Sequence, residues 1–183
     1  MYTFRVMNCR ILLIVFVLFL SCKNENKSQE VTTSIEKEDV LKEKPTVEAY
    51  DFNAFEKFLN RKDDKIYVVN FWATWCAPCI KELPYFEAIN KNFKSKNVEV
   101  LLVSLDFPKQ YQTKLIPFIK KHQLQSKVVA LNDPDSNAWI PKVSEEWSGA
   151  IPATVIYNKD KRMFYEQSFN YNQLKTEIEK FIN

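Results

Sequence analysis

The sequence predicts an α/β domain whose β-sheet is covered by helices on both faces. Two runs, residues 66–71 and 98–105, are apolar at almost every position instead of alternating with polar residues. Continuous apolar runs of this kind are typical of strands buried on both faces. Segments with apolar residues at helical spacing separate these runs, giving the order helix, strand, helix, strand, helix, strand, hairpin and helix.

Two helices are predicted around the first strand. Asp51 can serve as the N-cap of the first helix, because its carboxylate can accept a hydrogen bond from a free backbone N–H. The apolar residues of that helix share one face: Phe52, Phe55, Phe58 and Leu59. The second helix covers residues 77–93, with apolar residues at helical spacing: Leu83, Phe86, Ile89 and Phe93. Pro84 lies inside it and predicts a kink, because proline removes a backbone donor.

The second half continues the alternation. After the strand 98–105, we expect a helix over residues 112–122 that Pro117 interrupts early. A short strand, 128–131, leads into the turn 132–135, whose Asn-Asp-Pro-Asp sequence is typical of turns. Residues 136–147 form a short helix or irregular cover over the core.

A hairpin and a helix close the chain. Strands 153–157 and 163–168 flank the polar turn 158–161. Asn170 then caps the last helix, with Gln173 placed to complete a capping box. The apolar face of that helix carries Leu174, Ile178 and Phe181.

Residues 1–21 are predicted to form a signal peptide for export. Arg5 and Arg10 precede an apolar run over residues 11–20, about half of the roughly 20 residues that span a bilayer. The run ends at Ser21 and Cys22, and residues 19–22 resemble a loose bacterial lipobox that places Cys22 for lipidation. The alternatives are an ordinary signal peptide or an uncleaved membrane anchor. Each of these interpretations exports the domain.

Residues 22–46 form a tether between the signal and the domain, residues 47–183. The segment is mostly Lys, Glu, Asn, Ser and Thr and has no aromatic residue, so it cannot offset the entropy lost on ordering. Cleavage before Cys22 removes two of the 26 basic residues and leaves 24 against 23 acidic ones, a formal charge of +1. With no basic stretch elsewhere, the charge gives no case for a nucleic-acid partner or an acidic substrate.

Cys76 and Cys79, with two residues between them, stand where a buried strand meets a helix. At a helix N-terminus, unpaired N–H groups and the helix dipole stabilise a thiolate, so Cys76 is the expected nucleophile and Cys79 its resolving partner. A purely structural disulfide is one alternative, although so short a loop adds little stability. Half of a zinc site is another, but the mature chain offers only Cys22 and His122 as further Cys or His ligands. We expect no metal and no cofactor beyond the redox pair itself.

The residues around this pair resemble a known superfamily. Residues 70–79 read Asn-Phe-Trp-Ala-Thr-Trp-Cys-Ala-Pro-Cys, Pro84 follows, and residues 151–154 read Ile-Pro-Ala-Thr. Over residues 47–183 the chain resembles the thioredoxin superfamily, and more closely its exported, membrane-tethered thiol-disulfide oxidoreductases of the TlpA and ResA type. The resemblance implies a central mixed sheet flanked by helices, with the strand 128–131 and its neighbours as the central insertion of this branch.

The resemblance also suggests roles for residues near the cysteines. Pro152 matches the cis-proline that faces the disulfide in that superfamily, and a cis bond holds the backbone of Ile151 out for substrate peptides. The alternative is a trans proline at a strand start. Trp75 adjoins the nucleophile and is expected to shield it or to contact substrate.

Asn70 departs from thioredoxin, which has a buried Asp at this position. A neutral amide cannot accept a proton from Cys79. Glu82 matches an acid characteristic of the ResA-like branch and can do so if burial raises its pKa. The alternative interpretation is that Glu82 is exposed and that its negative charge interacts favourably with the positive end of the helix dipole.

The resemblance predicts an enzyme that reduces disulfides in proteins outside the cytoplasm, as in cytochrome c maturation. Its implied partners are protein disulfides, a membrane-embedded thiol electron donor, and the membrane itself through the lipid on Cys22. Two alternatives remain: an oxidase or isomerase of exported proteins, and a redox-inert binding module with the same fold.

Overall fold

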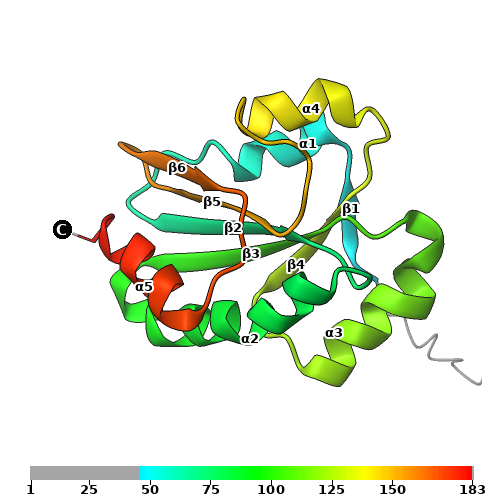
Figure 1. Cartoon of the computed structure of the whole chain (residues 1–183), viewed down its shortest axis with the longest axis horizontal. Coiled ribbons are helices and arrows are strands. Elements are labelled where there is room, and N and C mark those ends of the chain that lie inside the picture. The colour runs from blue at the N-terminus through cyan, green and yellow to red at the C-terminus, as the bar shows by residue number, and fades with distance from the viewer. Residues whose placement is uncertain (1–45, 183) are drawn as a thin grey trace, which may run out of the picture. The chain divides into compact units, whose positions relative to one another are not determined.

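Six strands form one sheet in the order β1-β4-β3-β2-β5-β6 (Figure 1). The structure is a computed structural model and describes residues 46–182. The predicted signal peptide (1–21), Cys22 and the tether up to residue 45 lie outside the described residues. Among residues 46–182, no helix combines the length and the apolar character needed to cross a membrane.

The sheet is mixed, as the resemblance implied. The strands are β1 (Glu48–Tyr50), β2 (Ile66–Trp72), β3 (Val98–Ser104), β4 (Lys127–Leu131), β5 (Ala153–Tyr157) and β6 (Arg162–Tyr165). The neighbouring pairs β1–β4, β4–β3 and β3–β2 run parallel, whereas β5 is antiparallel to both β2 and β6. The predicted insertion strand, β4, lies between β1 and β3 in the sheet.

Helices cover both faces of the sheet (Figure 1). One face carries α2 (Ala77–Asn92), α3 (Ile116–His122) and α5 (Tyr171–Glu179), and the other carries α1 (Phe52–Phe55) and α4 (Ser136–Val143). Short helices complete the chain: η1 (Glu56–Phe58), η2 (Lys94–Lys96), η3 (Pro108–Gln110) and the π-helix η4 (Tyr111–Leu115).

The sheet separates two hydrophobic cores, and β2 contributes to both. Every residue of β2 is buried. Val68 and Trp72 pack with α2 and α5, whereas Val69 and Phe71 pack with α1 and α4. Because successive side chains of a strand point to opposite faces, a strand between two cores must be apolar almost throughout. This arrangement explains the continuous apolar run in the sequence.

Several predicted elements are confirmed at their ends. Asp51 caps α1 by accepting a hydrogen bond from the Ala54 N–H at 2.8 Å. Asn170 and Gln173 form the predicted capping box of α5. Trp139 and Trp147, from α4 and the segment after it, are buried in the second core.

Some elements differ from the predictions, and others agree in detail. Strand β1 was not predicted, because it has only three residues and gains its place by pairing with β4. The predicted helix over residues 112–122 is divided into the π-helix η4 and the α-helix α3, and Pro117 stands in the first turn of α3, close to this change, as the predicted interruption implied. Within residues 136–147, α4 ends at Val143 and the chain continues without regular structure, in agreement with the expected short helix or irregular cover. Strand β6 ends at Tyr165, not at residue 168.

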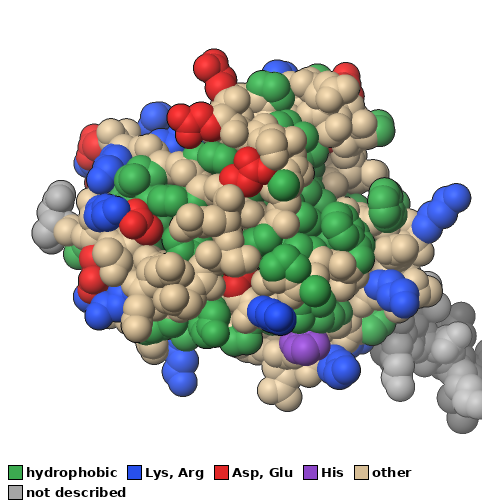
Figure 2. Space-filling model, in the orientation of Figure 1, with side chains coloured by type: hydrophobic (Ala, Val, Ile, Leu, Met, Phe, Trp, Pro, Cys, Tyr) green, Lys and Arg blue, Asp and Glu red, His purple; other side chains and the backbone are tan. Residues whose placement is uncertain are grey.

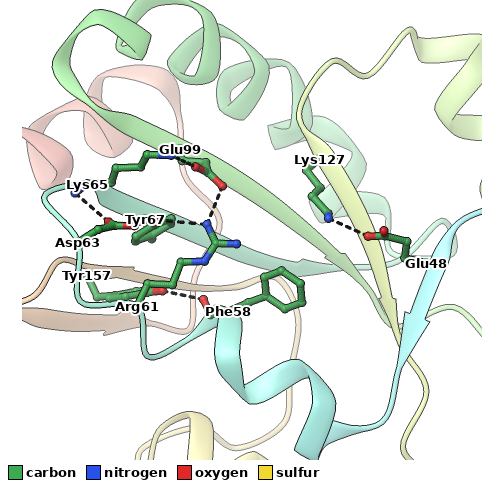
Figure 3. A network of polar contacts seen from close by, with 9 residues as sticks. All are labelled: Glu48, Phe58, Arg61, Asp63, Lys65, Tyr67, Glu99, Lys127 and Tyr157. Carbon is green, nitrogen blue, oxygen red and sulfur yellow. Dashed lines mark hydrogen bonds and ion pairs between the residues drawn. The ribbon is translucent and has the colours of Figure 1, made fainter.

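A polar network lies at the end of the sheet where β2 and β3 begin (Figure 3). The Arg61 guanidinium donates to the hydroxyl of Tyr67 at 3.3 Å and to Glu99 Oε1 at 3.1 Å, while Lys65 Nζ pairs with Glu99 Oε2 at 2.8 Å. The Tyr157 hydroxyl donates to the Phe58 carbonyl at 2.7 Å. These contacts join strands to the α1–η1 segment at the end of the sheet opposite the cysteines.

Candidate active site

Cys76 and Cys79 form a disulfide at the carboxyl end of β2. Cys76 is the N-cap residue of α2, and its Sγ accepts a hydrogen bond from the Cys79 N–H at 3.3 Å. Cys76 is 6% exposed and Cys79 is fully buried. The sulfur of Cys76 therefore lies at the N-terminus of a 16-residue helix, where backbone N–H groups and the helix dipole stabilise negative charge.

Ile151 lies beside the disulfide in the loop before β5, and Pro152 follows it. Their peptide bond is cis, as predicted. The Ile151 carbonyl oxygen lies 3.7 Å from Cys76 Sγ. Because β5 pairs antiparallel with β2, with Ala153 opposite Phe71, the start of β5 adjoins the end of β2. Sheet pairing thus brings together two segments that are far apart in sequence.

Glu82 lies on the buried side of α2 and is only 1% exposed, so the interpretation of an exposed Glu was wrong. Its two oxygens accept hydrogen bonds from Asn70 Nδ2 at 2.9 Å and from the Phe169 N–H at 2.7 Å. Burial raises the pKa of Glu82 to about 7, against the opposing effect of these hydrogen bonds. A carboxyl group with this pKa can take up or release a proton near neutral pH.

Asn70 is fully buried beside Glu82. Its Nδ2 also donates to Thr154 Oγ1 at 3.1 Å, whereas its Oδ1 has no hydrogen-bond partner. An amide can present either an acceptor or a donor when it turns over. Asn70 can therefore face Glu82 in both of its protonation states, donating to the carboxylate or accepting from the carboxylic acid.

Asp106 is a buried carboxylate that the sequence analysis missed. It lies just beyond β3 and accepts hydrogen bonds from the Thr74 N–H at 3.0 Å and from the Thr74 and Ser104 hydroxyls. Parallel pairing of β2 with β3 places their carboxyl ends together, so a polar residue after the second strand lies near the loop after the first. The sequence could have indicated Asp106 through this rule, because a polar residue directly follows the second predicted parallel strand. Asp106 fixes the backbone two residues before Cys76.

Glu166 is a second carboxylate that the sequence analysis missed. It accepts hydrogen bonds from the loop that leads to Ile151, on the other side of the disulfide. It accepts hydrogen bonds from the N–H groups of Ser148 at 3.0 Å and Ala150 at 3.1 Å, and from the Ser148 hydroxyl. The Ser148 hydroxyl and these N–H groups lower the pKa of Glu166. The bonds hold the segment that ends at Ile151. No sequence pattern pointed to a pairing between Glu166 and this loop.

The two tryptophans of the motif have different environments. Trp72 is fully buried and packs against Phe118, with ring centroids 5.4 Å apart. Trp75 is 56% exposed beside Cys76, where it can meet a substrate. His122 is exposed at the end of α3 and stacks on Phe118. Within residues 46–182, no group of three or more His, Cys, Asp or Glu side chains is arranged to hold a metal ion.

A protein-family model described as the AhpC/TSA family matches residues 40–165. The chain belongs to the AhpC/TSA family. A relative from Bacillus thuringiensis subsp. konkukian, the thiol-disulfide oxidoreductase ResA, is 27% identical over 175 residues, which cover 94% of this chain and 95% of the relative. The prediction of a thioredoxin-like thiol-disulfide oxidoreductase of the TlpA/ResA type is thereby confirmed.

Solved structures share the fold. A thioredoxin-related protein from Neisseria meningitidis serogroup B has a TM-score of 0.56 and 23% identity, and the match covers 65% of this chain and 86% of that one. A secreted thiol-disulfide isomerase from Corynebacterium glutamicum has a TM-score of 0.55 and 17% identity, covering 66% of this chain and 72% of that one. These likenesses confirm the thioredoxin-like α/β fold.

The raised pKa of Glu82 predicts a pH-dependent stability. Its pKa is about 4.5 in the unfolded chain and about 7 in the folded one. The folded state therefore binds this proton more tightly, and stability falls as the pH rises from 4.5 through 7, by up to about 3 kcal/mol. Urea unfolding of the oxidised protein between pH 5 and 8 should show this decline, and Glu82→Gln should flatten it. Glu145→Gln, at an exposed position, is the control; parallel curves for wild type and Glu82→Gln would contradict the prediction.

Proposed function

We propose that this protein is an exported oxidoreductase that reduces disulfides in proteins outside the cytoplasm. The observation that carries the proposal is the Cys76–Cys79 pair at the N-terminus of α2, with the Cys76 sulfur beside the Ile151 carbonyl. Cys76 keeps 6% of its surface exposed, whereas Cys79 is fully buried. This asymmetry suits Cys76 to attack and Cys79 to resolve.

The two cysteine thiols supply both of the electrons that reduce the substrate disulfide. The Cys76 thiolate attacks one sulfur of the substrate disulfide, and the departing substrate thiolate takes a proton. Cys79 then loses its proton and attacks Cys76 Sγ in the mixed disulfide, which releases the second substrate thiolate. The substrate gains two electrons, and the enzyme ends as the Cys76–Cys79 disulfide. No further cofactor is needed for these steps.

Glu82 is the proposed acceptor for the Cys79 proton. It follows Cys79 by one helical turn on the buried side of α2, and its pKa of about 7 suits proton exchange near neutral pH. After uptake of the proton, the Asn70 amide can turn its Oδ1 toward the new O–H, which gives that orphaned oxygen a donor. Asn70 thus supports the transfer without titrating itself.

The reductive direction and the place in cytochrome c maturation are supported by the resemblance to TlpA- and ResA-type proteins. A reductant outside the cytoplasm must be re-reduced after each turnover, because its surroundings favour disulfides. We therefore propose a membrane-embedded thiol protein as the electron donor. The tether predicted at residues 22–46 is consistent with an active domain that reaches partners near the bilayer.

The activity predicts a defined pattern in cysteine variants. With dithiothreitol as reductant, the wild type should accelerate the reduction of insulin, and Cys76→Ser should lose at least about 100-fold of the rate because it lacks the nucleophile. Cys79→Ser should accumulate a covalent adduct with the substrate, visible on non-reducing gels. A redox titration of the pair should fall near the reducing end of the range of roughly −270 to −120 mV spanned by the fold. A value near −120 mV would show an oxidase instead.

The role of Glu82 predicts a shift in the titration of Cys79. In a Cys76→Ser background, the Glu82 carboxylate should raise the pKa of the neighbouring thiol, so Glu82→Gln should lower the midpoint of Cys79 alkylation by about one pH unit. Iodoacetamide alkylation followed by mass spectrometry measures the midpoint. Glu145→Gln in the same background controls for a general charge effect, and an unchanged midpoint in Glu82→Gln would exclude the role.

Export and anchoring are proposed from the residues around Cys22, which lie outside the described structure. Expressed in a bacterium, the full chain should incorporate labelled palmitate and sediment with membranes. Cys22→Ser should lose both properties, because the lipid attaches through this thiol. A Cys22→Ser protein that still sediments with membranes after a carbonate wash would favour an uncleaved anchor.

A further inference from the structure

Two exposed aromatic side chains lie on neighbouring loops at the redox end of the sheet. In the described part of the chain, three large hydrophobic side chains are exposed: Trp75 at 56%, Tyr85 at 37% and Phe107 at 62%. Trp75 directly precedes Cys76, and Phe107 lies in the loop that follows β3. The proposed reaction gives Phe107 no role.

The two aromatic residues belong to loops that are tied to each other. Asp106 precedes Phe107 and accepts the hydrogen bonds of Thr74, which precedes Trp75. The Leu105 N–H also donates to the Trp72 carbonyl at 2.8 Å. The backbone next to each aromatic ring is therefore fixed to the other loop. The fold thus sets the relative position of the two backbone segments that carry Trp75 and Phe107.

The surface around these loops is apolar. Figure 2 shows hydrophobic side chains gathered over the region where β2 and β3 end and α2 begins in Figure 1. The Ile151 carbonyl lies beside the Cys76 sulfur in the same region. A polypeptide substrate that reaches Cys76 therefore meets an apolar surface as well as a backbone acceptor. An apolar surface beside a reactive sulfur is suited to receive apolar side chains of a protein partner.

We propose that Trp75 and Phe107 form an aromatic docking pair that receives an apolar side chain next to the reacting cysteine of a polypeptide substrate. Phe107 is then a specificity-determining residue for the reaction. The inference rests on the proposed function and adds a substrate preference to it. A membrane surface or a second copy of the chain is a less suitable occupant, because the two aromatic residues belong to the joined loops that lead to the sulfur a substrate must reach.

The test compares two cyclic disulfide peptides of equal length and charge, one with Leu and one with Ser beside each cysteine. Phe107→Ser should lower the ratio of kcat/KM for the Leu peptide to that for the Ser peptide about tenfold, which corresponds to about 1.4 kcal/mol. A loss of this size lies within what burial of one phenylalanine contributes. Most of the change should appear in KM, because docking precedes the chemical step.

Two further variants make the result specific. Phe107→Leu should keep most of the wild-type ratio, because it retains an apolar side chain. Tyr85→Ser removes the third exposed aromatic side chain, from α2, and should leave the ratio unchanged. A ratio that is unaffected by Phe107→Ser, or that falls equally in Tyr85→Ser, would overturn the inference while leaving the reductase activity standing. A wild type that reduces neither peptide would instead contradict the proposed function.

Discussion

The geometry of the site depends on the position of β2 between β3 and β5. Because β2 runs parallel to β3, the loop after β3 lies beside the loop after β2. Because β5 runs antiparallel to β2, the loop before β5 comes to the same place. The disulfide, Asp106 and Ile151 therefore meet at one end of the sheet. Burial of β2 on both faces fixes this strand in the middle, and the three loops follow from it.

Two carboxylates stabilise the loops on either side of the disulfide. Asp106 holds the loop that carries Cys76 through Thr74, and Glu166 holds the loop that carries Ile151 through Ser148 and Ala150. Charged acceptors form the stronger class of hydrogen bond to backbone N–H groups. The polar network around Arg61 and Glu99 lies at the other end of the sheet. Loop positioning and strand anchoring are thus carried out by separate groups.

The sequence predicted the parts of the site that a local pattern or the family resemblance can identify. The cysteine pair, the cis bond at Pro152 and the α5 cap were of this kind, and the structure contains each of them. The sequence left open whether Glu82 is buried or exposed, because this depends on how α2 packs against the rest of the domain. Asp106 and Glu166 escaped notice because each acts on residues distant in sequence. Strand β1 escaped it because a three-residue strand has too few positions to show alternation.

An amide at position 70, in place of a carboxyl group, simplifies the electrostatics around Glu82. Two carboxylates at this depth would repel each other and share their protons, and the pKa of either would belong to the pair. With an amide at position 70, Glu82 is the carboxyl group that contacts this position, and Asn70 donates to it. The charge at this buried position then depends on a single carboxyl group, whose pKa is raised mainly by burial. The amide can follow its protonation by turning over, so the buried site adapts to the proton without admitting a second charge.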